Sequence, residues 1–251
     1  MTQPPKLAML EHISSKDKNY VNQIFAAIAP RYDLVTKLLS FGQDQRWKRK
    51  LVGMAALEPQ HQVLDLACGT GDITFLMADR VRNGRVIGVD ITPGMIELAR
   101  SKARSIAARV QFEVGDIMRL DHPDCSFDRI TVGYGVRNVP HIPQLLNEAI
   151  RLLKPGGLFL SLDFGKPAQP SYCRIYLRFL GVVGSTLGWL LHRDPDVYGY
   201  IAESIKLYPG QDGVKRLMGE AGFVDTGIVQ VFRGAMAINF GCKPGREGQP
   251  H

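Results

Sequence analysis

The sequence predicts a doubly wound α/β fold, in which helices cover both faces of a mostly parallel sheet. From residue 62 onward, short runs rich in valine, isoleucine and leucine alternate with longer segments whose apolar residues recur every three or four positions. The first run ends in a turn with two glycines, CGTGD at 68–72, that leads directly into a helical segment. This alternation is typical of parallel strands joined by right-handed helical crossovers.

Each element follows from its local pattern. Residues 19–58 have apolar positions at three- and four-residue spacing with an interruption at Pro30, so we expect two or three short helices before Pro59. The alternating region predicts five strands, at 62–67, 84–90, 110–116, 127–135 and 158–165. The helices between them are expected at 72–81, 93–105 and 141–153, with a proline-glycine turn, KPGG, at 154–157.

The carboxy-terminal third predicts a helical lid and the end of the sheet. The lid is expected at about 170–205, and its most apolar part is LRFLGVVGSTLGWLL, about 15 residues at 177–191. A membrane-spanning helix needs roughly 20 apolar residues, so we predict no transmembrane segment. A helix that stops near Gly222 and strands within 224–242 follow.

These elements predict one structural domain. Residues 1–58 are expected to form a helical cap over the site, 59–242 the core that binds the cofactor, and 243–251 a flexible tail.

Composition narrows the class of protein. The apolar content of 45% and charged content of 22% are ordinary for a globular chain of 251 residues. The four cysteines are far apart and form no C-x-x-C motif, which argues against a zinc site or a disulfide framework, fits a reducing cytosol, and predicts no metal centre. Residues 1–18 lack the apolar core of a signal peptide.

The net charge of +7 is unevenly distributed. Lysine and arginine exceed aspartate and glutamate by nine to four in residues 1–50 and by twelve to eight in 151–251, whereas 51–150 has ten against twelve. The basic excess could serve an anionic membrane surface, a nucleic acid or only solubility.

The turn after the first strand favours an amino acid over a phosphate. The dinucleotide fingerprint G-x-G-x-x-G needs a third glycine, but that position is Thr74. A pyrophosphate would also meet Asp65 and Asp72, and anions avoid carboxylates. Two acids suit a cationic group, such as the ammonium of a methionine moiety. Asp72 could equally be a helix cap.

Two further acids end the next strands. Asp90 ends the second strand, where a carboxylate can accept both hydroxyls of a ribose. Asp116 follows the third strand, where it can accept from an adenine amino group beside the backbone of Ile117. Acids at these successive positions predict a ligand with adenine, ribose and an amino acid: S-adenosylmethionine.

Several longer blocks resemble a known family. They are IFAAIAPRYDLVTKLLSFGQDQRWK (24–48), VLDLACGTGDIT (63–74), GVDITPGM (88–95), SFDRITVGYGVRNV (126–139), LKPGG with LDFGKP (153–167), and YIAESIKLYPGQ with MGEAGF (200–223). Over roughly residues 20–225 the sequence resembles the class I methyltransferases, and among them the C-methyltransferases of ubiquinone and menaquinone biosynthesis. The glycine motif indicates only the cofactor, whereas the RYD…SFG…RWK and YGVRN blocks are much more restrictive.

The resemblance implies a Rossmann-like fold with a seven-stranded, mostly parallel sheet. It also implies methyl transfer from S-adenosylmethionine to a ring carbon of a reduced, prenylated quinone precursor. The cofactor-binding residues that we expect on this basis are Asp65, Ala67, Cys68, Gly69, Thr70, Gly71, Asp90, Ile91, Met95, Asp116, Ile117, Gly133 and Tyr32.

The resemblance also implies catalytic and substrate residues. Arg137 is expected to stabilise a phenolate or to order a water that takes the ring proton, with Asn138 orienting it and Tyr134 stacking near the sulfonium or the ring. Alternatively, Arg137 is a structural partner of a carboxylate. Expected substrate contacts are Ser40, Arg46 and Asp163.

The sequence departs from the family pattern in three places. LDFGKP stands where LEFSKP is common, Gly133 stands where serine is frequent, and the carboxy-terminal segment is only loosely similar. These departures could alter the quinone pocket. A methyltransferase acting on another lipophilic or aromatic small molecule therefore stays open, as does a non-catalytic cofactor-binding subunit. A nicotinamide-dependent oxidoreductase is disfavoured by Thr74 and the acids.

The expected partner is a lipophilic quinol. A homodimer or a quinone-biosynthesis complex is a further possibility, whereas the absence of an Asn-Pro-Pro-Tyr or paired-cysteine motif argues against nucleic acid. The basic segments and the lid suggest a cytoplasmic protein in peripheral contact with an anionic membrane at its inner face.

Overall fold

The computed structural model describes residues 25–245 except 27, 41 and 104–108, and the side chains of residues 30, 32 and 33 are also outside the description. Seven strands form one sheet in the order β3-β2-β1-β4-β5-β7-β6. The strands are β1 (Gln62–Leu66), β2 (Arg85–Asp90), β3 (Val110–Val114), β4 (Phe127–Gly133), β5 (Leu153–Phe164), β6 (Val224–Val231) and β7 (Met236–Cys242).

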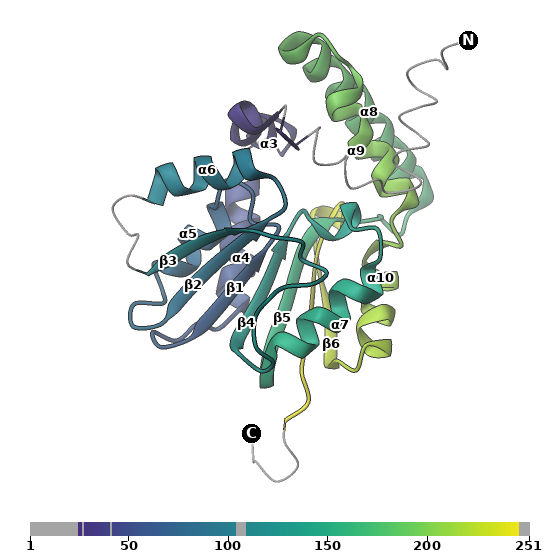
Figure 1. Ribbon diagram of the computed structural model, residues 1–251. Helices are drawn as coiled ribbons and strands as arrows, with labels where there is room; N and C mark the ends of the chain where they lie inside the picture. The colour runs from purple at the N-terminus through teal and green to yellow at the C-terminus, as the bar shows by residue number, and fades with distance from the viewer. Residues whose placement is uncertain (1–24, 27, 41, 104–108, 246–251) are drawn as a thin grey trace, which may run out of the picture.

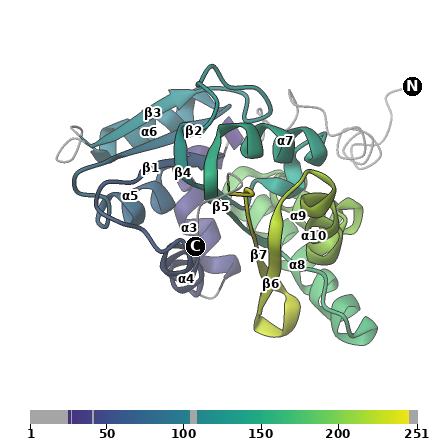
Figure 2. The ribbon, with the colours of Figure 1, turned by 90° about the horizontal axis from the view of Figure 1, so that it is seen from below.

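The sheet is parallel except at one strand. β7 runs antiparallel to both β5 and β6, and the pair β6–β7 lies at the end of the sheet opposite β3 (Figure 2). The strand order reverses between β1 and β4, and open α/β sheets bind ligands beyond the carboxyl ends of the strands at such a reversal. The predicted mostly parallel, seven-stranded fold is confirmed.

Helices cover both faces of the sheet. One face carries α4 (Asp44–Met54), α5 (Asp72–Ala78) and α6 (Pro93–Lys102), and the other carries α7 (Ile142–Leu152) and α10 (Gly210–Glu220). Side chains along a strand alternate between faces: in β1, Leu64 packs in the α7–α10 layer and Val63 in the α4–α6 layer. All three predicted crossover helices form.

A third group of helices lies over the carboxyl ends of the strands. It consists of α3 (Tyr32–Leu39), α8 (Pro170–His192) and α9 (Asp196–Leu207), with the short 3-10 helices η1 (Ala29–Arg31), η3 (Val136–Asn138) and η4 (Phe232–Gly234) nearby. Val35, Leu180 and Ile201 share a buried apolar cluster with Met95 from the start of α6. Figure 1 shows α8 and α9 side by side, projecting beyond the edge of the sheet.

One strand, β5, begins earlier than the sequence predicts. β5 begins at Leu153 rather than 158 because KPGG forms a bulge inside it: Phe127 pairs with Leu153 and Arg129 with Leu158, and Gly156 has a φ of +75°. The helical segment predicted at about 170–205 consists of α8, with 23 residues, followed by α9. Among the described residues α8 is the one helix whose length and apolar composition would allow it to cross a membrane.

Candidate active site

Two cavities lie at the carboxyl ends of the strands and share Tyr134 as a lining residue. The small cavity, about 100 Å³, is formed by the turn after β1, the ends of β2 and β4, the loop after β3 and the start of α6. The large cavity, about 710 Å³, is formed by α3, α4, α8, α9 and the segment from Phe232 to Met236. Its lining is mainly aromatic and aliphatic.

The glycine turn brings backbone close to the small cavity. Gly71 has a φ of +92°, a conformation that favours glycine, and a Cβ there would lie 2.9 Å from the rings of Phe75 and Phe112. Gly133 is enclosed as well, because a Cβ would collide with the side chain of Ile73. Glycine at position 133, where serine is frequent in the family, therefore allows α5 to pack closely against β4.

Asp65 lies inside the protein rather than on the cavity surface. Its side chain is fully buried, and the hydroxyls of Thr74 and Thr131 donate to its two carboxylate oxygens at 2.6 and 2.7 Å. Burial raises the pKa of Asp65 to about 6, against the opposing effect of these hydrogen bonds. The predicted direct contact with a cationic ligand does not fit this position. Asp65 instead ties β1 to α5 and β4 beneath the turn.

Asp72 also has a different partner from the one predicted. Its carboxylate accepts hydrogen bonds from Lys48 Nζ at 2.7 Å and from Gln45 Nε2 at 2.9 Å, both on α4. Burial opposes ionisation of Asp72, but the adjacent Lys48 ammonium outweighs it and holds the pKa below its usual value. Lys48 also pairs with Asp44 at 3.1 Å. Asp72 therefore joins α4 to α5.

Asp90 is on the wall of the small cavity. One carboxylate oxygen accepts the Gly69 N–H at 2.8 Å and the other accepts the Thr92 N–H at 2.9 Å. Each carboxylate oxygen can accept a second hydrogen bond, so the group can serve a ligand hydroxyl while it holds the turn. Burial raises the pKa of Asp90, and the backbone hydrogen bonds oppose that shift.

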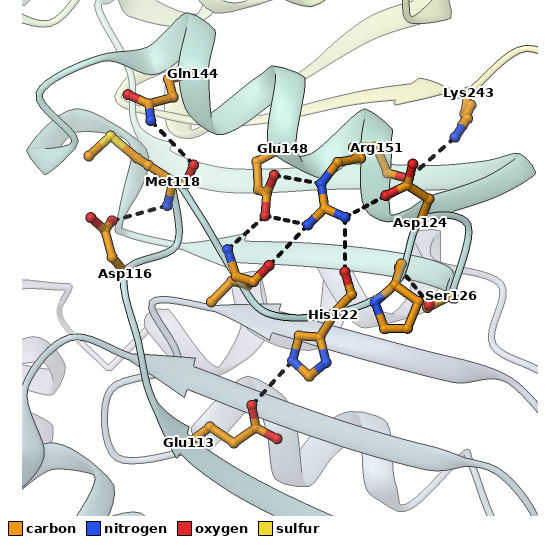
Figure 3. Close-up of polar contacts among 12 residues, drawn as sticks. Glu113, Asp116, Met118, His122, Asp124, Ser126, Gln144, Glu148, Arg151 and Lys243 are labelled. Carbon is orange, nitrogen blue, oxygen red and sulfur yellow. Dashed lines mark hydrogen bonds and ion pairs between the residues drawn. The ribbon is translucent and has the colours of Figure 1, made fainter.

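The loop that carries Asp116 is held by α7, as Figure 3 shows. Glu148 Oε1 accepts the Leu120 N–H at 2.7 Å. The guanidinium of Arg151 donates to the carbonyls of Leu120 and His122 at 3.0 and 2.9 Å. These side chains satisfy backbone groups that a loop outside regular structure would otherwise leave unpaired. Two residues of α7 thus fix the loop that brings Asp116 to the cavity.

Arg137 is buried at the edge of the large cavity. Its Nη1 lies 2.7 Å from Asp163 Oδ1 and 2.8 Å from the carbonyl of Tyr134, and its own N–H donates to Asp163 Oδ2 at 3.1 Å. The guanidinium carbon lies 4.8 Å from the ring centre of Phe164. The carboxylate pair that the sequence left as an alternative is present. Since Arg137 also lines the cavity, pairing does not remove it from the site.

Tyr200 joins this cluster from α9. It lines the large cavity, and the side chains of Arg137 and Asn138 lie close enough to its hydroxyl to influence its pKa. Burial raises the pKa of Tyr200, and Arg137 opposes that shift. Asn138 lines the small cavity, so the Tyr200 hydroxyl lies where the two cavities meet. Sequence reasoning missed Tyr200, although it lies within the YIAESIKLYPGQ block.

The other predicted residues divide between the cavities and the interior. Those that line the small cavity are Ala67, Gly69, Asp90, Ile91, Met95, Asp116, Ile117, Gly133, Tyr134 and Asn138. Ser40, Arg46, Tyr134 and Arg137 line the large one. Cys68, Thr70, Gly71, Asp65 and Asp163 line neither. The side chain of Tyr32 is outside the described part of the structure.

Comparison with known proteins identifies the family. Residues 13–243 match the ubiE/COQ5 methyltransferase family. The chain belongs to the ubiE/COQ5 methyltransferase family. A demethylmenaquinone methyltransferase from Thermus thermophilus is 36% identical over 221 residues, which cover 88% of this methyltransferase and 100% of the relative. A ubiquinone/menaquinone biosynthesis C-methyltransferase UbiE from Xanthomonas campestris is 38% identical over 235 residues, covering 92% and 93%.

Solved structures show the same fold. A SAM-dependent methyltransferase from Thermotoga maritima, described as a possible histamine N-methyltransferase, has a TM-score of 0.63 at 20% identity and covers 88% of this chain and 98% of its own. A phosphoethanolamine N-methyltransferase 2 from Haemonchus contortus has a TM-score of 0.60 at 14% identity, covering 79% and 52%. The ubiE/COQ5 family member described here is therefore a SAM-dependent, Rossmann-like methyltransferase.

The small cavity of this methyltransferase suits S-adenosylmethionine chemically. Asp90 and Asp116 offer carboxylate acceptors on its wall, which match hydroxyl and amino donors of a nucleoside. A Cβ on Gly135 would lie only 2.7 Å from the Cβ of Ala67. The two backbone segments that frame the cavity are therefore too close together for a side chain at position 135.

Proposed function

We propose that this methyltransferase adds a methyl group to a ring carbon of a reduced, prenylated quinone precursor, of the demethylmenaquinol or demethylubiquinol type. The names of its relatives support this substrate class. The observation that carries the proposal is a buried guanidinium, Arg137, on the wall of a large and mainly apolar cavity next to the small cavity. An apolar cavity with one buried cationic group suits a lipophilic ring that bears an ionised phenol.

In this proposal the small cavity holds the cofactor. When bound, S-adenosylmethionine supplies a methyl group that a nucleophilic carbon can accept. Asp90 accepts hydrogen bonds from the ribose hydroxyls, and Asp116 accepts from the adenine amino group beside Ile117. The backbone at Gly69 lies on the cavity wall without a side chain, and the remaining predicted residues on this wall pack against the ligand.

Arg137 acts on the acceptor. A cation beside the phenol oxygen favours the ionised form, and that charge makes the neighbouring ring carbon nucleophilic. The ring proton must then leave, and a water held by Arg137 accepts it. Asp163 keeps the guanidinium in place and so acts through Arg137 rather than by direct substrate contact.

Three further side chains position the ring. Asn138 and the Tyr200 hydroxyl orient the guanidinium and the phenol oxygen, because both lie next to Arg137 where the cavities meet. Tyr134 packs against Phe164, with ring centres 5.7 Å apart, and separates the two ligands. Ser40 and Arg46, on the wall formed by α3 and α4, contact the substrate farther from the reacting carbon.

The test is product identification. The protein is incubated with methyl-labelled S-adenosylmethionine and a panel of demethylated benzoquinols and naphthoquinols under reducing conditions, and mass spectrometry locates the label. We expect a label on a ring carbon of at least one prenylated quinol. Label only on oxygen, or only on an aromatic compound without a prenyl tail, would contradict the proposal.

Location and partners belong to the same proposal. A prenylated substrate resides in a membrane, so we propose a cytoplasmic protein in peripheral contact with the inner face of an anionic membrane. A homodimer or a quinone-biosynthesis complex is the further partner prediction, and light scattering on the purified chain distinguishes a monomer from either.

A further inference from the structure

Helix α8 presents an apolar stripe to solvent, interrupted by the exposed Thr186. Ile175, Val182, Trp189 and Leu190 are between 59% and 67% exposed, far more than apolar side chains on the inner face of the same helix. They recur at the spacing of one helical face. We call these four residues, together with Phe179, the α8 stripe. The side chains of a helix that only supports a core would not show this pattern.

The opposite face of α8 is fixed to α9 by glycines. At Gly184 a Cβ would lie 2.7 Å from the carbonyl oxygen of Tyr198, and at Gly188 it would collide with the carbonyl of Asp194. The two helices therefore pack with their backbones close together, and this rigid pair holds the α8 stripe outward. If α8 crossed a bilayer, this packing would be lost, so the stripe suits a surface rather than a span.

Positive charge accompanies the apolar stripe. Arg174 and Arg178 are exposed on the same side of α8, and Arg193 follows its last turn. The sequence from 164 to 193 contains no aspartate or glutamate. An apolar stripe flanked by cations is the pattern of helices that lie in the interface of an anionic bilayer.

The mouth of the large cavity opens at this surface. Ile175, Phe179 and Phe232 line the cavity and are also exposed to solvent, so they form its rim. The segment at 232 is joined to α8 by hydrogen bonds from the hydroxyls of Tyr172 and Tyr176 to backbone carbonyls at 3.4 and 2.8 Å. Exposed Arg233 adds another cation to the rim.

We infer that the α8 stripe, with Arg174, Arg178 and the rim residue Phe232, docks on the surface of an anionic lipid bilayer and places the mouth of the large cavity against it. This inference rests on the proposed function, because a lipid-resident quinol could then enter without crossing water. The binding partner that we propose for the α8 stripe is the surface of an anionic bilayer. The apolar side chains complement its acyl boundary, and the flanking arginines complement its negative charge.

Vesicle flotation tests the surface with the full-length chain. We expect binding to phosphatidylglycerol vesicles at low salt, with at least tenfold weaker binding to phosphatidylcholine vesicles or at high salt. R174Q/R178Q should weaken binding by about 30-fold, since each of the two arginines near an anionic surface contributes about 1 kcal/mol. V182S/L190S should also weaken it by about tenfold or more, because neither side chain could enter the apolar boundary. None of these residues lines either cavity.

Matched variants on other surfaces are the controls. R82Q/R85Q removes two exposed arginines near the amino end of β2, and V114S/V224S removes two valines that are 51% and 44% exposed. Both should bind vesicles like the wild type. Wild-type binding by the α8 variants, or equal losses in the controls, would overturn the inference.

Tryptophan fluorescence gives a second readout of the same contact. The chain has two tryptophans, the buried Trp47 and Trp189 on the α8 stripe. Brominated phosphatidylglycerol vesicles should quench the emission of Trp189, and W189F should lose that quenching and keep the emission of Trp47. Quenching that is unchanged in W189F would show that another part of the protein meets the lipid.

Two outcomes separate this inference from the proposed function. Methylation of a quinol in detergent without vesicle binding would overturn the docking surface and leave the proposed function standing. Vesicle binding without methylation of any quinol would overturn the proposed function and leave the docking surface standing. A dimer in light scattering that V182S/L190S dissociates, without vesicle binding, would identify a second copy of the chain as the occupant and overturn the lipid surface.

Discussion

The two cavities share Tyr134 but are built in different ways and carry opposite charges. The small cavity is lined mainly by residues within a few positions of a strand end, and its charged groups are the carboxylates of Asp90 and Asp116. The large cavity is lined by helices from both ends of the chain, and its charged groups are the guanidiniums of Arg46 and Arg137. Acids suit a cationic methyl donor, and a buried cation suits an ionised phenol. In the proposed function, this division of charge separates the methyl donor from the acceptor.

The largest loss of stability and turnover is expected when the buried Arg137–Asp163 pair beside the large cavity is broken. D163A leaves the Arg137 guanidinium buried without its carboxylate, and breaking one partner of a buried pair costs about 3–5 kcal/mol. Urea unfolding should show this loss, and turnover should fall with it. E220A breaks the exposed pair with Arg216 and should leave the urea midpoint unchanged. Equal, small effects in both variants would show that the Arg137–Asp163 pair is not structural.

The free energy of unfolding should depend on pH through Asp65, which lies beneath the turn at the small cavity. Its pKa is about 6 in the folded protein against 3.8 for an unperturbed group, so the folded state binds more protons between those values. The free energy of unfolding should therefore fall by roughly 3 kcal/mol in all as pH rises from about 3 to about 7. D65N should lack this component. The difference between the urea unfolding curves of wild type and D65N isolates it, and a difference that does not vary with pH would contradict the assignment.

Cofactor affinity should depend on the small cavity alone. D90A removes a carboxylate from the cavity wall that we propose accepts hydrogen bonds from the ribose, and the dissociation constant for S-adenosylmethionine should rise by about 10- to 100-fold, as expected for hydrogen bonds to a charged group. The KM for the quinol should stay within about twofold. Calorimetry and initial rates measure the two quantities. D79A, an exposed acid after α5, is the control and should change neither.

The smallest effect is expected at the junction of the cavities. Y200F removes one hydroxyl beside Arg137 and should lower kcat by about 3- to 10-fold, the value of one hydrogen bond, with unchanged cofactor affinity. Tyr198 is on the same helix, but its hydroxyl meets His192 at 3.0 Å. Y198F should therefore affect kcat less than Y200F does. Equal losses would mean that packing of α9, rather than the Tyr200 hydroxyl, is responsible.

The sequence predicts much of the lining of the small cavity because most of these residues lie next to the ends of strands. Strand ends are readable from apolar runs and glycine turns, so Ala67, Gly69, Asp90 and Asp116 could be placed without a structure. The local sequence pattern does not determine whether a side chain points into the cavity or into the core. The local pattern predicts Asp65 as a ligand contact and Thr74 only as the residue that replaces a glycine, whereas the two side chains are hydrogen-bonded to each other inside the core.

The large cavity could not be predicted to the same depth. It depends on how α8 and α9 pack over α3, and contacts between segments more than a hundred residues apart leave no local signal. Ser40, Arg46 and Arg137 were reached only through the family resemblance. Tyr200, and the exposure of the α8 stripe beside the cavity mouth, became visible only in the assembled fold.

The separation of donor and acceptor sites is tested most directly by R137L/D163L. This double variant removes both buried charges, so neither is left unpaired, and such replacements are often neutral for stability. Cofactor affinity by calorimetry and quinol methylation by mass spectrometry are then measured on the same preparation. We predict an affinity for S-adenosylmethionine within about twofold of wild type and a loss of turnover of at least about 100-fold. Turnover near the wild-type rate, or a loss of cofactor affinity as large as the loss of turnover, would contradict it.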